Sequence, residues 1–375
     1  MFAILLTGIL ALTLSAECSE LKFVFVMVKG PDHEACNYAG GPQLTTLQEK
    51  DSVLTEDGKT EAYELGKLLD KVYKKQLKVD KWDATKTYWA VSTKAMRTKE
   101  AALIVGAGLE NNPAKAKGNW TQQQLDSTHF DAMPGFSRFW NPQQCPAYFR
   151  ALSLQNQKIK KLLEKYQTTI KEVTAKFPSI DGTKAQHIWI AYETFKRMKQ
   201  QGRKEVEGIN TATMQKLKEF SSEFVLIALT STDQMRKLAG GLILKDLFND
   251  IDELTKDHAQ PHAPGGIKNK MNIFVVPQAI LAAQMAVFMP EGTKLRDQPI
   301  TASNFYPDDQ SYVIIELYQD KNKWNVQLQY KNNKNSGWLP IKVQGCNSPM
   351  CPYDTLKKSL NKYIIDDARH KQACK

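Results

Sequence analysis

The chain has 375 residues with 42% hydrophobic content, which is enough to bury one large core or two modest ones. Its formal net charge of +11 comes from lysines spread along the chain, which is typical of a solvated basic surface, and no recognised nucleic-acid-binding module is present. We therefore expect no nucleic acid partner, while a weak attraction to acidic polysaccharides or anionic cell surfaces stays open.

The first 18 residues are typical of a secretory signal peptide. The apolar run FAILLTGILALTL is followed by small residues, and cleavage could follow Ala16 or Cys18. No later stretch approaches the roughly 20 apolar residues that a membrane-spanning helix needs. We therefore expect a soluble, secreted, extracellular protein without a membrane partner, and the Asn119 sequon, N-W-T, fits glycosylation in that pathway.

The stretch from Leu21 to Ala35 is expected to form the centre of the fold. Residues 23–28 are apolar without polar alternation, which is typical of a strand buried on both faces of a parallel or mixed sheet. An open α/β sheet binds its ligand at the carboxyl ends of such strands. The following loop, residues 29–35, is therefore the first place to look for a site.

Further elements follow in chain order. Apolar spacing predicts an amphipathic helix over about 56–77, capped by Thr55, then a strand over 87–91 and a helix over about 94–106. Residues 112–233 change character: a polar and aromatic loop precedes three helical segments, over about 159–177, 183–201 and 211–229. A strand is predicted again at 271–276, followed by a helix through 284–286 and a hairpin of strands 311–318 and 324–330.

The loop after the first strand resembles a known motif. Residues 29–35 read K-G-P-D-H-E-A where the histidine acid phosphatases read R-H-G-x-R-x-P, and the YELG at 63–66 resembles the same family. The resemblance runs over essentially the whole mature chain. It implies an α/β fold with a mixed sheet flanked by helices, made of residues 19–111 and 234–375, and an inserted, mainly helical cap over 112–233 that roofs the site.

The same resemblance implies that the catalytic residues of the family are replaced. The family's phosphorylated histidine corresponds to Gly30, and one of its phosphate-binding arginines corresponds to Val91. Its His-Asp motif, in which the aspartate is the proton donor, corresponds to Val276 and Pro277. A second arginine of the family is kept as Arg97. Hydrolysis of a phosphomonoester by this route needs a nucleophile, cations and an acid. We therefore expect no enzyme activity and assign no catalytic residue. Asp32 and His33 could form an improvised site, but such a pair is more often found at the surface.

A cavity without phosphate-binding charge suits a mostly apolar ligand with a few placed polar contacts. Trp189 corresponds to a family tryptophan at the pocket, although each aromatic residue could instead pack in the core. Aromatic rings and a carboxylate from Asp32, Glu34 or Glu193 would suit a protonated amine, and Lys29 would suit a carboxylate ligand. The expected ligand-binding residues are Lys29, Asp32, His33, Glu34, Val91, Phe139, Trp189, Glu193 and Val276.

The combination resembles the acid-phosphatase-like salivary proteins of blood-feeding insects, particularly fleas. The resemblance implies sequestration of biogenic amines, such as serotonin and catecholamines, or of leukotrienes, so that vasoconstriction and inflammation are blunted. Two alternatives stay open: a polyanion-binding or protein-binding surface protein that acts through its basic face, and an active acid phosphatase with an atypical site. A homodimer is compatible with the family.

Six cysteines in an exported chain favour disulfides. The resemblance implies the pairs Cys145–Cys374 and Cys346–Cys351. Cys18 then leaves with the signal peptide, or Cys36 stays unpaired. His258 and His262 have a spacing that could bind a metal ion, but a Pro/Gly-rich exposed loop is the preferred interpretation, so we expect no metal and no cofactor.

Overall fold

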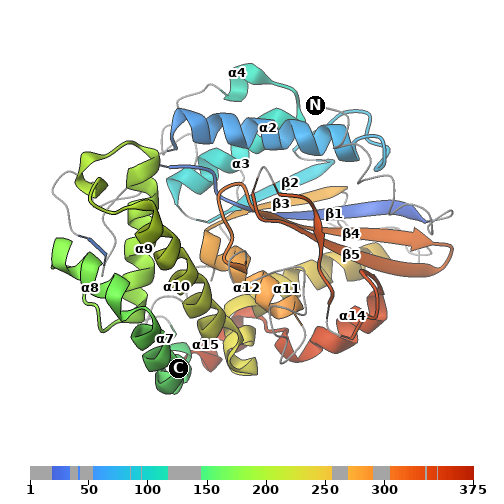
Figure 1. The fold of residues 1–375 in the computed structure, drawn as a ribbon. Coiled ribbons are helices and arrows are strands. Elements are labelled where there is room, and N and C mark those ends of the chain that lie inside the picture. The colour runs from blue at the N-terminus through green and yellow to red at the C-terminus, as the bar shows by residue number, and fades with distance from the viewer. Residues whose placement is uncertain are drawn as a thin grey trace.

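The computed structural model describes residues 19–33, 41–42, 54–84, 86–93, 95–116, 145–255, 269–289, 305–333, 336–343 and 345–375. Its strands form one seven-stranded mixed sheet in the order β2-β3-β1-β4-β5-β6, with β7 also paired to β5 (Figure 1). The strands are β1 Glu20–Lys29, β2 Tyr88–Ser92, β3 Met271–Val276, β4 Tyr312–Asp320, β5 Lys323–Lys331, β6 Leu339–Pro340 and β7 Met350–Pro352.

Strand β1 lies inside the sheet, as its unbroken apolar run predicted. It pairs in parallel with β3 and antiparallel with β4. Because successive side chains of a strand point to opposite faces, Phe23 and Phe25 join one core cluster, while Val24 and Val26 join the other. The prediction of a mixed sheet with this strand buried on both faces is therefore confirmed.

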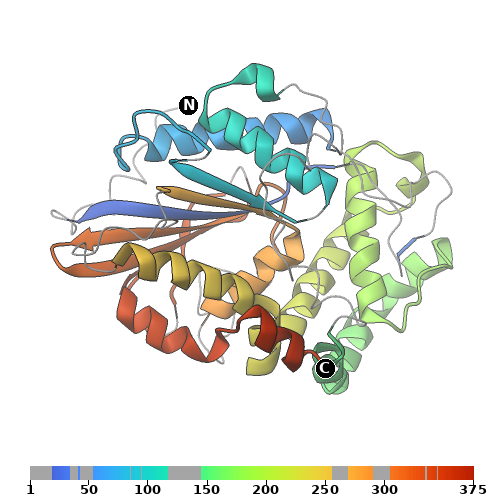
Figure 2. The ribbon, with the colours of Figure 1, turned by 180° about the vertical axis from the view of Figure 1, so that it is seen from behind.

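Helices cover both faces of the sheet. Helices α2 (Glu56–Tyr73) and α3 (Met96–Leu109) pack on one face, and α11 (Asp233–Thr255), α12 (Gln278–Phe288) and α14 (Tyr353–Leu360) lie on the other (Figures 1 and 2). Thr55 caps α2 as predicted, since its Oγ1 accepts a hydrogen bond from Gly58 N at 3.0 Å. A Cβ on Gly66 would collide with the Val105 carbonyl oxygen, so this glycine allows α2 and α3 to touch.

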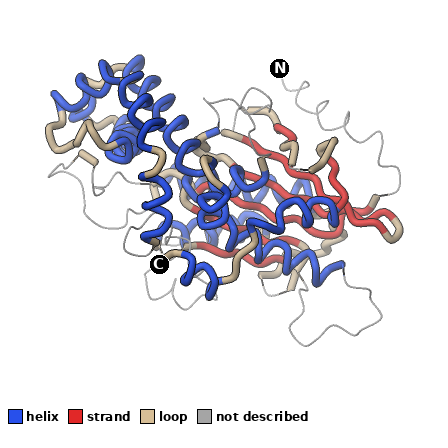
Figure 3. The backbone as a smooth tube through the Cα atoms, turned by 90° about the horizontal axis from the view of Figure 1, so that it is seen from below, coloured by secondary structure: helices blue, strands red, loops and turns tan. Residues whose placement is uncertain are grey.

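A group of helices stands beside one end of the sheet (Figures 1 and 3). The predicted helical segment over 159–177 is divided into two helices, because Tyr166 leaves helical geometry at φ −108° and ψ 14°. The predicted segments over 183–201 and 211–229 form one helix each. The helices of this group are α6 Pro146–Ser153, α7 Asn156–Lys165, α8 Gln167–Lys176, α9 Ala185–Gln200 and α10 Thr211–Thr230.

The remaining described elements are short, and two disulfides fasten the C-terminal part. The short helices are α4 Pro113–Ala116, α15 Asp367–Ala373 and the 3₁₀ turns Lys204–Val206 and Asn361–Tyr363. Both expected disulfides are present: Cys145–Cys374 joins the start of α6 to the end of α15, and Cys346–Cys351 closes a small loop.

Several predicted features lie outside the described residues, namely the signal peptide, Glu34, Cys36, Asn119, Phe139, His258 and His262. Among the helices of the described residues, none is long and apolar enough to cross a membrane.

Candidate functional site

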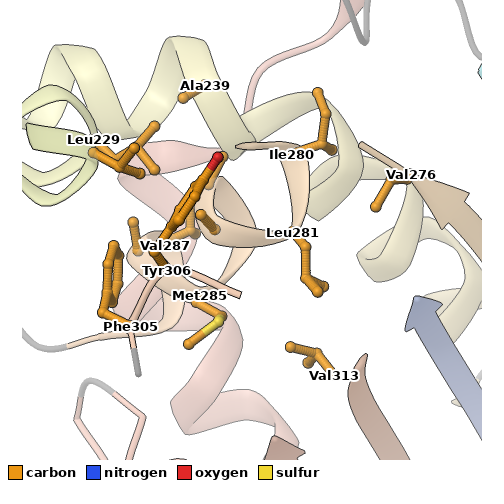
Figure 4. Close-up of a cluster of buried hydrophobic side chains, with 14 of the residues drawn as sticks. Leu229, Ala239, Val276, Ile280, Leu281, Met285, Val287, Phe305, Tyr306 and Val313 are labelled. Carbon is orange, nitrogen blue, oxygen red and sulfur yellow. The ribbon is translucent and has the colours of Figure 1, made fainter. Parts of the chain in front are cut away.

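A cavity of about 350 Å³ opens at the carboxyl ends of β1 and β3, where the sequence placed the site. Gly30 and Val276 come from these strand ends, and Gly30 N donates a hydrogen bond to the Val276 carbonyl at 2.9 Å. Pro277 and Gln278, at the start of α12, also line the cavity. Figure 4 shows Val276 and Tyr306 with the buried cluster around α12.

Helix α9 supplies the wall opposite the strand ends. Trp189, Glu193 and Arg197 are four residues apart, so that their side chains stack along one face of the helix, and all three line the cavity. The sequence predicted Trp189 and Glu193 at the site. The same four-residue spacing identifies Arg197, which the sequence analysis missed.

Two aromatic side chains are fixed to each other at the cavity. Trp189 Nε1 donates a hydrogen bond to the Tyr306 hydroxyl at 2.6 Å, and their ring centroids lie 6.4 Å apart in an edge-on arrangement. Tyr306 is 1% exposed, while Trp189 is half-buried. A buried hydroxyl that is held by an indole N–H gives the cavity a rigid aromatic wall.

Glu193 carries a carboxylate oxygen with unused hydrogen-bonding capacity. Its Oε1 is buried and accepts no hydrogen bond from any described residue, although the side chain lines the cavity. Burial raises the pKa of Glu193, while the nearby cations Lys196, Arg197 and Lys29 lower it. Burial and the charge of the Glu193 carboxylate raise the pKa of Tyr306, which lines the same cavity. A donor inside the cavity would satisfy this oxygen.

The cations beside the cavity are held by aspartates. Lys29 Nζ pairs with Asp309, and Arg197 Nη2 donates to the same carboxylate at 2.8 Å. Burial would raise the pKa of Asp309, but Lys29, Lys196 and Arg197 hold it well below its usual range. Burial and the Arg197 guanidinium lower the pKa of Lys29 to about 8, against the attraction of Asp309.

The neighbouring Asp308 extends this charged cluster. It pairs with Lys196 at 2.5 Å and with Lys218 of α10 at 2.9 Å. Burial would raise its pKa, but these lysines lower it to about 2. Both aspartates therefore stay ionised and neutralise the cations that they bind.

The structure also shows which predicted residues line the cavity. Lys29, His33, Trp189, Glu193 and Val276 line it. His33 is fixed through its backbone, because its carbonyl accepts a hydrogen bond from Gln201 Nε2 at 3.0 Å and it forms an isolated bridge with Leu54.

Two predicted ligand-binding residues are not among the side chains that line the cavity. Asp32 pairs with Arg197 through Oδ1 and accepts a hydrogen bond from Thr55 Oγ1 at 3.2 Å through Oδ2, so it holds α9 against the loop. Val91 is 0% exposed, because the alternation of β2 turns its side chain into the core beside Phe274, its partner in register. These two residues therefore support the cavity wall in the structure, and their contact with a ligand stays a prediction.

Four other residues complete the site without having been predicted there. Tyr306, Asp308 and Asp309 come from the segment before β4, and Arg97, at the start of α3, lines the cavity. Arg97 was visible as the kept arginine of a family motif. No local sequence pattern marks the Tyr306–Asp309 segment as part of the site, because it reaches β1 only through the pairing of β4 with β1 in the sheet.

The order of the sheet, the cavity at its carboxyl end and the helical group beside it define a phosphatase-type α/β fold. The chain belongs to the histidine phosphatase superfamily (branch 2), whose family model matches residues 31–331. It is similar to the Acid phosphatase-like protein XcAP-1 of Xenopsylla cheopis, with 45% identity over 99% of both chains. It is also similar to the Acid phosphatase-like protein XcAP-2 of the same organism, with 41% identity over 99% of this chain and 98% of that protein.

Solved structures show the same fold at low sequence identity. The phytase of Hafnia alvei in its apo form matches with a TM-score of 0.64 and 13% identity, over 96% of this chain and 99% of the phytase. The phytase of Citrobacter braakii matches with a TM-score of 0.63 and 12% identity, over 95% and 99%. These likenesses describe the fold alone.

Proposed function

We propose that the protein is a secreted, non-catalytic binder of small amines, with the cavity beneath α9 as its binding site. Serotonin and catecholamines have the required chemistry, namely an aromatic ring and a protonated amine. By sequestering such mediators of a host, the protein would counter vasoconstriction and inflammation.

The unsatisfied oxygen of Glu193 is the single observation that carries this proposal. A ligand ammonium would donate to Glu193 Oε1, and a hydrogen bond between charged partners is worth roughly 1.5–3 kcal/mol. Trp189 and Tyr306 offer aromatic surface on the same cavity, where cation–π contact would add to the binding. Asp32, the other described acidic candidate, is already paired with Arg197.

An amine fits these contacts better than an eicosanoid. Lys29 is the residue that the sequence offered to a ligand carboxylate, and its ammonium already pairs with Asp309. An unsatisfied carboxylate oxygen at the wall would also repel a second carboxylate. Leukotrienes are therefore the second class of ligand to test in this cavity.

The same site gives no support to phosphoryl transfer. Glycine offers no nucleophile at position 30, and Val276 with Pro277 offers no acid at the end of β3. The cations Lys29, Lys196 and Arg197 are bound by Asp308 and Asp309. We therefore propose that the protein has kept the phosphatase fold and has no phosphatase activity.

Secretion and a place in saliva belong to the same proposal. The apolar N-terminal run supports export, and the two disulfides suit an oxidising compartment. The relatives from Xenopsylla cheopis are named acid phosphatase-like, and the resemblance to flea salivary proteins supports a role in blood feeding.

Calorimetric titration with serotonin, noradrenaline and a cysteinyl leukotriene tests the proposal, with hydrolysis of p-nitrophenyl phosphate measured on the same sample. We expect one amine bound per chain with a dissociation constant below about 1 μM, equivalent to roughly 8 kcal/mol, and no turnover. Absence of heat with both amines would overturn the proposal. Binding to heparin that weakens steeply with salt would favour the basic surface, and turnover would favour an atypical phosphatase.

A further inference from the structure

A second cavity of about 380 Å³ lies on the face of the sheet that α2 and α3 cover. It shares only Lys29 and Pro31 with the described lining of the first cavity, so the end of β1 separates the two. Its size falls within the usual range of small-molecule sites. Its apolar wall is formed by Val28, Ala62, Leu65, Leu68, Val105 and Val275.

Lys331, near the end of β5, brings a cation to this apolar cavity. Its Nζ lies 5.7 Å from the ring centroid of Tyr312 and 5.9 Å from that of Trp338. Burial lowers the pKa of Lys331. Within the described part of the chain, no carboxylate lies within ion-pair distance of its ammonium group.

The other charged groups of this cavity have partners. Lys29 pairs with Asp309, and Glu64, at the exposed rim, pairs with Lys67 at 3.1 Å. Glu61 accepts a hydrogen bond from the Asp32 backbone N–H at 3.4 Å. Among the described charged side chains of this cavity, Lys331 is therefore the cation that a ligand carboxylate can pair with at the lowest cost in free energy. No existing ion pair has to be broken first.

We propose that this second cavity binds an apolar carboxylate of the fatty acid type, with its chain between α2 and the sheet and its carboxylate on Lys331. Apolar walls bury a hydrocarbon chain, and the Lys331 ammonium group, which lies beside the packed rings of Tyr312 and Trp338, marks the place of the acid. Lys331 and Leu65 line only the second cavity, and Glu193 and Trp189 line only the first, so this inference does not depend on the amine-binding function of the first.

The test compares decanoate with decanol, which has the same chain without the charge. Calorimetry on the full protein should show one decanoate bound per chain, at least about tenfold more tightly than decanol. Lys331→Met should weaken decanoate binding about tenfold and leave decanol and serotonin binding unchanged. Lys323→Met, at the exposed start of the same strand, is the matched control and should bind decanoate as the wild type does.

Two further variants keep the outcome interpretable. Leu65→Trp fills the second cavity and should weaken both decanoate and decanol, while Glu193→Gln in the first cavity should leave both unchanged. The proposal is overturned if decanoate gives no heat at millimolar concentration or if Lys331→Met binds it like the wild type. It also fails if decanoate binding responds to Glu193→Gln or is displaced by serotonin, because decanoate would then occupy the first cavity.

Discussion

At the scale of single residues, Glu193 presents a buried oxygen that accepts no hydrogen bond from the described residues. Burial raises the pKa of this carboxyl group. In the protein without ligand, Glu193 therefore stays protonated to a higher pH than an exposed glutamate does. An amine ligand, with a pKa like that of lysine at about 10.4, stays charged over the acidic range. Under the proposed function, amine binding therefore requires the ionised form of Glu193.

We expect the affinity for serotonin to fall as the pH falls through the raised pKa of Glu193. Binding should also release a proton in that range, because the ligand stabilises the carboxylate. Calorimetry at several pH values, in buffers with different ionisation enthalpies, measures both effects. Glu193→Gln should remove the pH dependence, whereas Glu164→Gln on the exposed side of α7 should keep it. A dependence that persists in Glu193→Gln would assign it to another group.

Gly30 allows a second test at the residue scale. A Cβ at this position would meet Thr98 Cγ2 at 3.7 Å, an ordinary contact, so Gly30→His should fold. The imidazole would occupy part of the cavity and weaken serotonin binding by about tenfold or more. We expect no hydrolysis of p-nitrophenyl phosphate, because no acid stands at Val276 and Pro277. Turnover in this variant would show that a single residue had silenced an otherwise complete phosphatase.

Single residues also show what the sequence could predict. Trp189 was predicted from its position in the family and Glu193 as one of three candidate carboxylates, and both line the cavity. Val91 was assigned to the ligand from its place in a motif, but the direction of a strand side chain depends on the register of β2 against β3. Asp309 was missed because it lies 280 residues from Lys29, its partner in the ion pair.

At the scale of elements, local patterns predicted most helices and strands. Strand β3 was predicted with the bounds that it has, and α9 and α10 begin and end within two residues of the expected positions. These elements carry their own apolar periodicity. The break at Tyr166 between α7 and α8 escaped prediction, because the apolar stripe continues through it.

Ion pairs between side chains hold helix α9 against the segment before β4. The packing of α9 should therefore be sensitive to acid. The pKa of Asp308 is lowered from 3.8 to about 2, mainly by lysines that outweigh its burial, and that of Asp309 is also lowered. A carboxylate with a lowered pKa stabilises the fold above its unfolded value of about 3.9, and this stabilisation is lost as the pH falls towards its folded value.

The wild type should therefore lose thermal stability steeply between about pH 4 and pH 2. The double variant Asp308→Asn/Asp309→Asn should be less stable at neutral pH, because buried lysines and Arg197 lose their partners. It should also show a flatter loss between the same pH values. Melting temperatures measured by circular dichroism follow both effects, with exposed Asp80→Asn as the control. Parallel curves for the wild type and the double variant would contradict this account of α9.

At the scale of the whole molecule, the Cys145–Cys374 disulfide ties the start of the helical group to the C-terminus across 229 residues. A cross-link over a long loop restricts the unfolded chain more than one over a short loop. Replacing both cysteines by serine should lower the free energy of unfolding by about 2–5 kcal/mol. The matched pair Cys346→Ser/Cys351→Ser, which opens a separation of 5 residues, should cost less. Equal losses in thermal melts would contradict the loop-length argument.

The whole fold also supports the proposal that a phosphatase architecture binds a ligand without reacting with it. The sheet still gathers β1, β3 and α9 around one cavity. The aspartates before β4 take up the cations, and α9 contributes a carboxylate instead. Under the proposed function, the charge that the cavity recognises is reversed, from an anionic phosphate to a cationic amine.

The most direct test of this reversal compares tryptamine with tryptophol, its hydroxyl analogue, in the wild type and in Glu193→Gln. The account predicts that the wild type binds tryptamine at least about tenfold more tightly than tryptophol. A tenfold difference in affinity corresponds to roughly 1.4 kcal/mol, about the contribution of one hydrogen bond between charged groups. In Glu193→Gln this preference should disappear, while tryptophol binds as before. Equal binding of both ligands by the wild type, or a preference that survives in the variant, would contradict the account.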